Sequence, residues 1–150
     1  MADHVRTQLR DAAISALTGL ATSGSRVYKT RVHAMQDANL PGLRISTANG
    51  NSARRGVGAG PGRALLERTV ELVVECCAKA NADLDDTLDQ MLQEVEVAIS
   101  QNQNLGGAKW IVLRREEADF EGEAESPVGV LRATFEALLL TAQNAPDVAL

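Results

Sequence analysis

The stretch RRGVGAGPGR, residues 54–63, comes nearest in this chain to residue types with a known chemistry, because arginines flank a series of alternating glycines. Glycine lets the backbone approach a ligand closely, so such a loop can cradle a phosphate group. The same composition also suits a flexible arm that becomes ordered only against another protein. The two interpretations make different demands on the neighbouring residues.

A Walker loop requires Gly-x-x-x-x-Gly-Lys followed by Ser or Thr, since the lysine reaches the terminal phosphates and the hydroxyl ligates magnesium. With the second glycine placed at Gly62, Val57 stands where the first glycine should be. Arg63 and Ala64 then occupy the lysine and hydroxyl positions. The requirements of this motif are not met.

The dinucleotide pattern Gly-x-Gly-x-x-Gly fails as well, because its third glycine would fall on Pro61 or Arg63. Both kinds of phosphate loop open a helix, whereas a strand pattern follows here. We therefore interpret the stretch as a partner-interface loop, and a small anion- or nucleotide-binding α/β module remains the less favoured alternative. The candidate contact residues are Arg54, Arg55, Gly56, Gly58, Gly60 and Arg63.

A row of carboxylates follows later in the chain, with acidic residues spaced two apart. General acid–base catalysis requires two carboxylates that face each other across a substrate, and one extended row does not provide this. We interpret the row as a solvated acidic edge, or as a surface past which DNA slides without binding. Its members are Glu117, Asp119, Glu121, Glu123 and Glu125.

The remaining candidates for chemistry are isolated. Cys76 and Cys77 are adjacent in a strand pattern, so their side chains point to opposite faces and cannot share a usual metal site. His4 and His33 have no Ser or Asp at a spacing that suggests a catalytic triad. We therefore expect no catalytic residue, no metal site and no cofactor.

The composition narrows the class of protein further. A chain of 150 residues fits one domain, residues 1–150. Its net charge of −5 opposes general attraction to nucleic acid, and 3% aromatic residues leave few rings for stacking bases. The charged N-terminus and the lack of a long apolar run predict a protein made in the cytoplasm and not held in a membrane.

Hydrophobic periodicity predicts two amphipathic helices. The first follows Asp3 as a possible N-cap and stops at Gly19 or Gly24. The second is capped by Asp83, and glycines 106–107 end it.

Period-two patterns predict strands within 25–33, 40–47, 64–80, 108–125 and 128–142. Residues 49–63 should form a flexible loop and residues 143–150 a loose tail. This pattern predicts an α+β fold: a two-layer domain with both helices packed on one face of a mostly antiparallel sheet of about four to five strands.

The same elements resemble the tail terminator proteins of long-tailed bacteriophages, the minor tail protein U type. The likeness rests on the leading helix, the Arg-Val-Tyr strand at 26–28, the LPGLRI strand at 40–45 and a closing strand pair joined by an acidic turn. The glycine-rich segment 49–63 is larger than the resemblance requires.

The resemblance implies a non-enzymatic virion protein, made in the bacterial cytoplasm and located at the joint between tail and head. It would form a hexameric ring on the tail tube protein, stop tube polymerisation and attach the head–tail connector protein. DNA would pass through the lumen without specific binding, past acidic side chains, and six copies carry a charge of about −30. Leu138 and Leu140 are candidate ring-interface residues. Another neck component, a tail-completion or head-closure protein, is the alternative.

Overall fold

A computed structural model describes residues 2–29, 35–56, 60–121 and 127–150. The fold is α+β, with two α-helices and a five-stranded, mostly antiparallel open sheet. In chain order the elements are α1 (Val5–Leu17), β1 (Val27–Tyr28), the 3₁₀ turn η1 (Asp37–Asn39), β2 (Gly42–Gly56), β3 (Leu65–Lys79), α2 (Leu84–Ser100), the 3₁₀ turn η2 (Leu105–Gly107), β4 (Trp110–Glu121) and β5 (Val128–Ala142).

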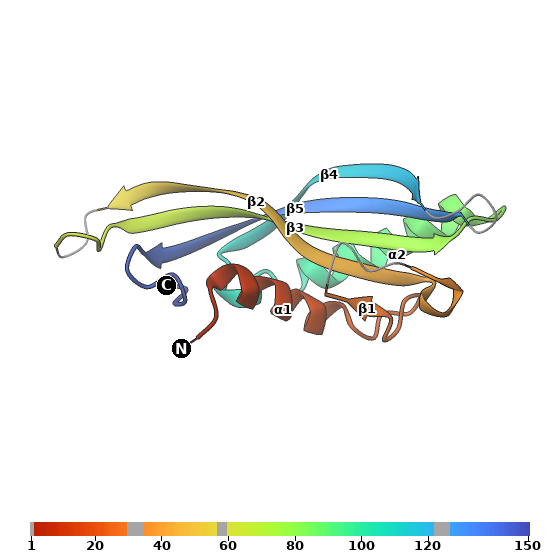
Figure 1. Cartoon of the computed structure of the whole chain (residues 1–150), viewed down its shortest axis with the longest axis horizontal. Coiled ribbons are helices and arrows are strands. Elements are labelled where there is room, and N and C mark those ends of the chain that lie inside the picture. The colour runs from red at the N-terminus through yellow and green to blue at the C-terminus, as the bar shows by residue number, and fades with distance from the viewer. Residues whose placement is uncertain (1, 30–34, 57–59, 122–126) are drawn as a thin grey trace.

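The strands lie in the order β1-β2-β3-β5-β4, and β1 is parallel to β2 while the other neighbours are antiparallel. Both helices lie on the same side of the sheet in Figure 1. Their buried side chains, for example Leu9 of α1 and Met91 of α2, join alternate residues of the strands in one hydrophobic core. We call this side of the sheet the helix-covered face and the other side the open face.

The long central strand over 64–80 is confirmed as β3, which pairs along its whole length with β5. Its two adjacent cysteines point to opposite faces, as expected. Cys76 lies in the main core, whereas Cys77 lies in a small second cluster with Met35, Val128 and Val130 on the open face. Burial of both thiols follows from a sheet that is covered locally on each side.

The helix boundaries differ from those that the sequence predicts. His4 rather than Asp3 caps α1, because its Nδ1 accepts a hydrogen bond of 3.1 Å from the Arg6 backbone N–H. Helix α2 ends at Ser100, before the two glycines. The side chains of Asn102 and Gln103 donate to the last carbonyl groups of α2, which satisfies that end of the helix early.

The expected loop over 49–63 is wrong in its first half. Residues 49–56 continue β2, and the register with β3 runs from Gly50 opposite Val70 to Gly56 opposite Leu65, with irregularities after Thr47 and Arg54. Backbone hydrogen bonds to a long neighbouring strand stabilise this segment, although its side chains bury almost nothing. The expectation of a loop considered only which side chains could be buried, and it left out the hydrogen bonds that the backbone makes with β3.

Residues 143–150, expected as a loose tail, make hydrogen bonds to α1 and β5. The backbone carbonyl of Pro146 accepts a hydrogen bond from Val5 N–H, and the carbonyl of Asp147 accepts one from the Gln8 side chain. At the end of the tail, Leu150 N–H donates to the carbonyl of Leu140 in β5. The tail therefore links the beginning of α1 to the last strand.

Candidate functional site

The end of the β2–β3 hairpin projects beyond the rest of the molecule. Strand β4 begins at Trp110, which pairs with Leu138 of β5. At the same level, Leu138 pairs with Thr69 of β3, and Thr69 pairs with Asn51 of β2. Beyond that level β2 and β3 continue with β5 but without β4, and Figure 1 shows the hairpin reaching out at the left. We call residues 52–56 and 60–67 the arm.

The arm holds most of the glycine–arginine residues that the sequence singled out. Arg54 and Arg55 lie on its first strand, and Arg63 lies just before its second strand; all three side chains are exposed. Gly56 ends the first strand. Gly60 and Gly62 have left-handed φ values of 105° and 73° at the turn, whereas Gly58 lies outside the described residues. The segment that follows is a strand, as expected, and no helix in the described part of the chain begins next to these glycines.

The acidic row on β4 is brought onto the open face by an irregularity between Leu113 and Arg115. Glu117, Asp119 and Glu121 follow at alternate positions, while Glu123 and Glu125 lie outside the described residues. The row is not a set of free charges, however, because two of its three described members bind arginines.

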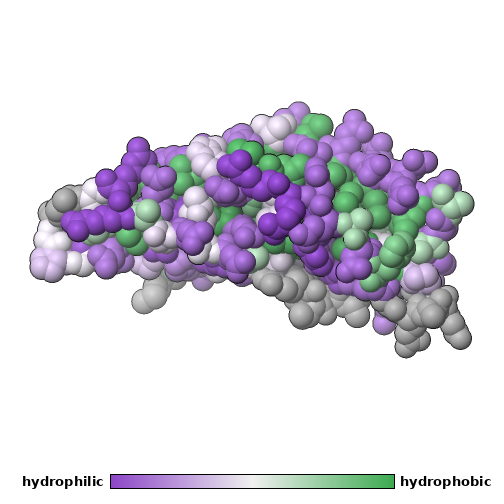
Figure 2. Space-filling view, turned by 90° about the horizontal axis from the view of Figure 1, so that it is seen from above, coloured by the Kyte–Doolittle hydropathy of each residue, from purple (hydrophilic) through white to green (hydrophobic). Residues whose placement is uncertain are grey.

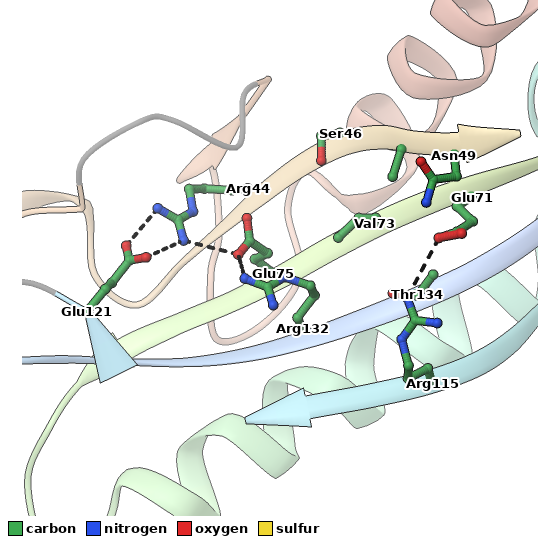
Figure 3. A pocket seen from close by; sticks show the side chains of 11 residues that line it. Arg44, Ser46, Asn49, Glu71, Val73, Glu75, Arg115, Glu121, Arg132 and Thr134 are labelled. Atoms are coloured by element: carbon green, nitrogen blue, oxygen red, sulfur yellow. Dashed lines mark hydrogen bonds and ion pairs between the residues drawn. The ribbon is translucent and has the colours of Figure 1, made fainter. Parts of the chain in front are cut away.

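Those arginines belong to a ladder of ion pairs across the open face (Figure 3). Arg44 of β2 donates from Nη1 and Nη2 to the two oxygens of Glu121, at 2.7 and 3.0 Å. Oε2 of Glu75 on β3 accepts from Arg44 at 3.2 Å and from Arg132 of β5 at 3.1 Å. Arg132 also reaches Glu117 of β4 at 3.4 Å. The ladder thus joins four strands.

Burial sets the electrostatics of this ladder. Arg44 and Glu75 are each only 3% exposed. Burial by itself lowers the pKa of Arg44, but its hydrogen bonds to Glu121 and the nearby negative charge of Glu75 outweigh that effect and raise its pKa above the ordinary value. Arg44 is therefore permanently charged in the folded protein.

The ladder borders a polar hollow of about 300 Å³ on the open face. Glu71, at the other end of the hollow, lies 3.7 Å from Arg115. The hollow is lined by three carboxylates, those of Glu71, Glu75 and Glu121. Each lies within ion-pair distance of an arginine, so positive and negative charges are matched. This arrangement crosslinks strands, and it does not offer a carboxylate poised for proton transfer.

Sequence reasoning missed Arg44, Glu75 and Arg132 as a group. The signal was the presence of single charged residues inside apolar runs, such as Arg44 between Leu43 and Ile45. The sequence does not reveal which strands are neighbours or their register, so it could not show that these three residues would meet.

The two leucines expected at a ring interface are both on the last strand, on the face opposite the core. Leu138 is only 9% exposed, whereas Leu140 is partly exposed. Leu138 therefore offers little surface in the single chain.

The cysteines are unsuited to reactivity. Burial, reinforced for Cys76 by its neighbour, raises the pKa of each thiol to about 12. Among the described residues, no group of three His, Cys, Asp or Glu side chains is arranged to hold a metal ion. Within the same residues, no helix has the length and apolar character needed to cross a bilayer.

Comparison with known proteins gives a match at the level of structure. No protein-family model matches the chain, and no curated protein matches it. Among solved structures, a chain from the virion of a native gene transfer agent particle is similar, with a TM-score of 0.50 and 19% sequence identity. The match covers 92% of this chain and 92% of that chain. At this identity the likeness shows a shared fold along nearly the whole length.

Proposed function

We propose that this protein is a structural component of a phage-like virion and has no enzymatic activity. The observation that carries the proposal is the fold shared over 92% of both chains with a chain of a gene transfer agent virion. The match spans 92% of both chains, so it is a likeness of whole folds rather than of a shared small motif. The step from this fold to a role in the virion is an analogy, and the experiments below test it. The fully paired carboxylates of the hollow agree with a structural role.

Within the virion, the protein forms a ring at the head-proximal end of the tail tube, stops tube polymerisation and presents the attachment surface for the head–tail connector. The resemblance of the sequence to tail terminator proteins supports this finer assignment. A ring requires that each copy presents two different surfaces to its two neighbours. The projecting arm provides one surface that the compact part of the chain does not use.

A ring of six such chains has a charge of about −30, which suits a lumen through which DNA passes without binding. Of the acidic row, Asp119 is exposed and makes no ion pair with a described residue, so it is the best placed of the described acidic residues to face DNA. Glu117 and Glu121 contribute less, because arginines already offset their charges.

Labelling the subunit in intact particles tests the location. An antibody or a fused tag visible by electron microscopy should mark the joint between tail and head. Label found only on the capsid shell or at the distal tail tip would contradict the proposal.

A variant with a shortened arm tests the role in assembly. Replacing residues 53–67 by Asn-Gly joins Ser52 to Arg68, which face each other in the register, through a two-residue hairpin turn. The variant should fold, because the removed residues lie outside the core. It should also give particles with unjoined heads and tails. Normal infectious titre from this variant would contradict a role of the arm in the joint.

A further inference from the structure

Unpaired positive charges gather at one end of the molecule. Among the described residues, no carboxylate lies within ion-pair distance of Arg54 or Arg63 of the arm. Arg55 has Glu67 as a partner, but at 3.8 Å and with both side chains largely exposed. The hydrophilic character of this end is visible at the left of Figure 2. The arm therefore carries arginines that the described part of the chain does not neutralise.

Unpaired negative charges and one exposed aromatic ring gather away from the arm, along the line where α2 passes β4. We call this set the acidic strip. Its members are Asp85, Asp89 and Glu96 of α2 and Glu116 and Phe120 of β4.

The α2 and β4 parts of the acidic strip are neighbours. Leu84, at the start of α2, packs so closely on Gly129 that a Cβ there would lie 2.6 Å from it, and Gly129 pairs with Phe120 of β4. Further along, Glu96 lines the same surface depression as Leu113. Asp89 shares this side of α2 because of the helical repeat.

The irregularity in β4 explains why the acidic strip has no basic residue. It places Arg114 and Arg115 against the open face, where they meet Glu136 and Glu71. Glu116 and Phe120 remain on the helix-covered side, and α2 itself contains no lysine or arginine. None of the four carboxylates of the acidic strip forms an ion pair with a described residue.

Phe120 makes the acidic strip more than a cluster of charges. It is 66% exposed, the largest exposed fraction among the large hydrophobic side chains that the structure describes. An aromatic ring beside carboxylates is a favourable site for a guanidinium group, which stacks on the ring and donates hydrogen bonds to the acids.

We propose that the arm of one copy docks on the acidic strip of a second copy of this chain. The arm points away from the acidic strip of its own chain, because it extends beyond the start of β4 while β4 and α2 occupy the other part of the molecule (Figure 1). A basic projection and an acidic, aromatic surface on the same chain form a heterologous contact, which repeats from copy to copy and can close a ring. The inference deepens the proposed ring function and rests on it for the closure of the ring.

Charge reversal in the purified full-length protein tests the contact. Sedimentation velocity over a concentration series measures the dissociation constant between copies, at low and at high salt. Arg54→Glu with Arg63→Glu should weaken association about tenfold or more, and Asp89→Lys with Glu116→Lys should do the same. Association of the wild-type protein should weaken as salt increases.

The decisive variant combines both reversals in one chain. An acidic arm then meets a basic strip, so association should return to within a few-fold of the wild-type value. Phe120→Ser should weaken association without changing its salt dependence. It should keep the fold, because Phe120 is exposed. Circular dichroism checks the fold of every variant.

Matched controls change the same number of charges elsewhere. Lys29→Glu with Lys109→Glu controls for the arm, and Asp3→Lys with Asp37→Lys controls for the acidic strip, since all four are exposed and lie outside the arm and the acidic strip. Both controls should associate like the wild-type protein. A wild-type chain that does not self-associate, or a combined reversal that fails to restore association, overturns the proposal.

The outcome separates this contact from the proposed function. If the combined reversal restores association but the subunit is absent from the joint between tail and head, the contact stands and the function is wrong. If the subunit is at that joint but the single-surface reversals associate normally, the function stands and the contact is wrong.

Discussion

Arg44 shows how a single charged residue can hold several strands together. It lies on the open face, where an alternating strand normally exposes its polar side chains, yet it is almost completely buried. Its guanidinium group contacts Glu75 on the next strand and Glu121 on β4, at the far edge of the sheet. The sheet must therefore curl enough to bring β4 toward β2.

The substitution Arg44→Met tests this contribution. It leaves Glu75 buried with only one of its two arginine partners and frees Glu121 from β2. Removing one partner of a buried ion pair typically costs about 3 kcal/mol, so the free energy of unfolding should fall by about that amount. Chemical denaturation measures the change. Arg55→Met is the control, since its ion pair is exposed and long, and it should change stability by less than about 0.5 kcal/mol. Equal effects of both substitutions would refute the structural role of the ladder.

His4 gives the protein a specific dependence on pH. Burial, followed by the positive charges of Arg68 and Arg6, lowers its pKa below the ordinary value. Its Nδ1 also accepts the capping hydrogen bond of α1, and a proton on this atom would remove that bond. Because the pKa is lower in the folded state, the stabilisation is present above the ordinary histidine pKa. It is lost as the pH falls through the lowered value.

Comparison of wild type with His4→Asn tests this effect. Asparagine keeps a capping oxygen but does not titrate. The melting temperature of the wild-type protein should therefore fall more steeply than that of the variant as the pH decreases from neutral toward 5. Parallel curves would show that His4 stays unprotonated or does not stabilise the helix.

At the scale of elements, α1 depends on the close approach of η2. Gly106 has a left-handed φ of 59°, and a Cβ built there would lie 2.6 Å from the Cα of Leu9. The conflict is with backbone rather than with a flexible side chain, so the helix would have to move. This contact fixes α1 against the turn that leads into β4.

Gly106→Ala should lower the free energy of unfolding by about 3 kcal/mol or more, from backbone strain together with displacement of α1. Gly62→Ala is the matched control, because its φ of 73° is similar but no atom lies within 4 Å of the added Cβ. It should cost only about 1 kcal/mol. Thermal or urea denaturation measures both, and similar losses would show that the contact with Leu9 yields easily.

At the scale of the whole molecule, the sheet is covered on both faces where β3 carries its cysteines. Cys76 and Cys77 therefore report on opposite sides of the same strand. Their raised pKa values and burial make reaction dependent on a large opening of the structure.

We expect both thiols to react with a thiol reagent at the same slow rate at mildly alkaline pH, and rapidly in denaturant. In the Arg44→Met variant the logarithm of the rate should increase in proportion to the loss in the free energy of unfolding. Rapid reaction of Cys77 alone would show that the small cluster on the open face opens independently of the core.

Local patterns in the sequence predicted much of the fold. Alternation over 64–80, with one slip at Arg68, predicted the central strand, and the helical repeat after Asp83 predicted α2, because each segment's apolar side must be buried whatever it packs against. Adjacent cysteines in a strand necessarily faced opposite ways. The acidic row was expected on a strand within 108–125, and its described members lie on β4. The glycine–arginine segment was recognised as a surface feature, although the strand conformation of residues 49–56 was not.

Other features depended on contacts between distant segments. Residues 49–56 form a strand only because β3 offers a partner for their backbone, and a pattern of side chains contains no information on that pairing. The ladder of Arg44, Glu75 and Arg132 required the register of three strands. The separation of the arm from the acidic strip likewise arises from the register of β2, β3, β5 and β4, which places the end of the β2–β3 hairpin far from the end of β4. Residue periodicity determines which side of an element is buried, whereas strand pairing in three dimensions decides which charges meet and which remain available to another molecule.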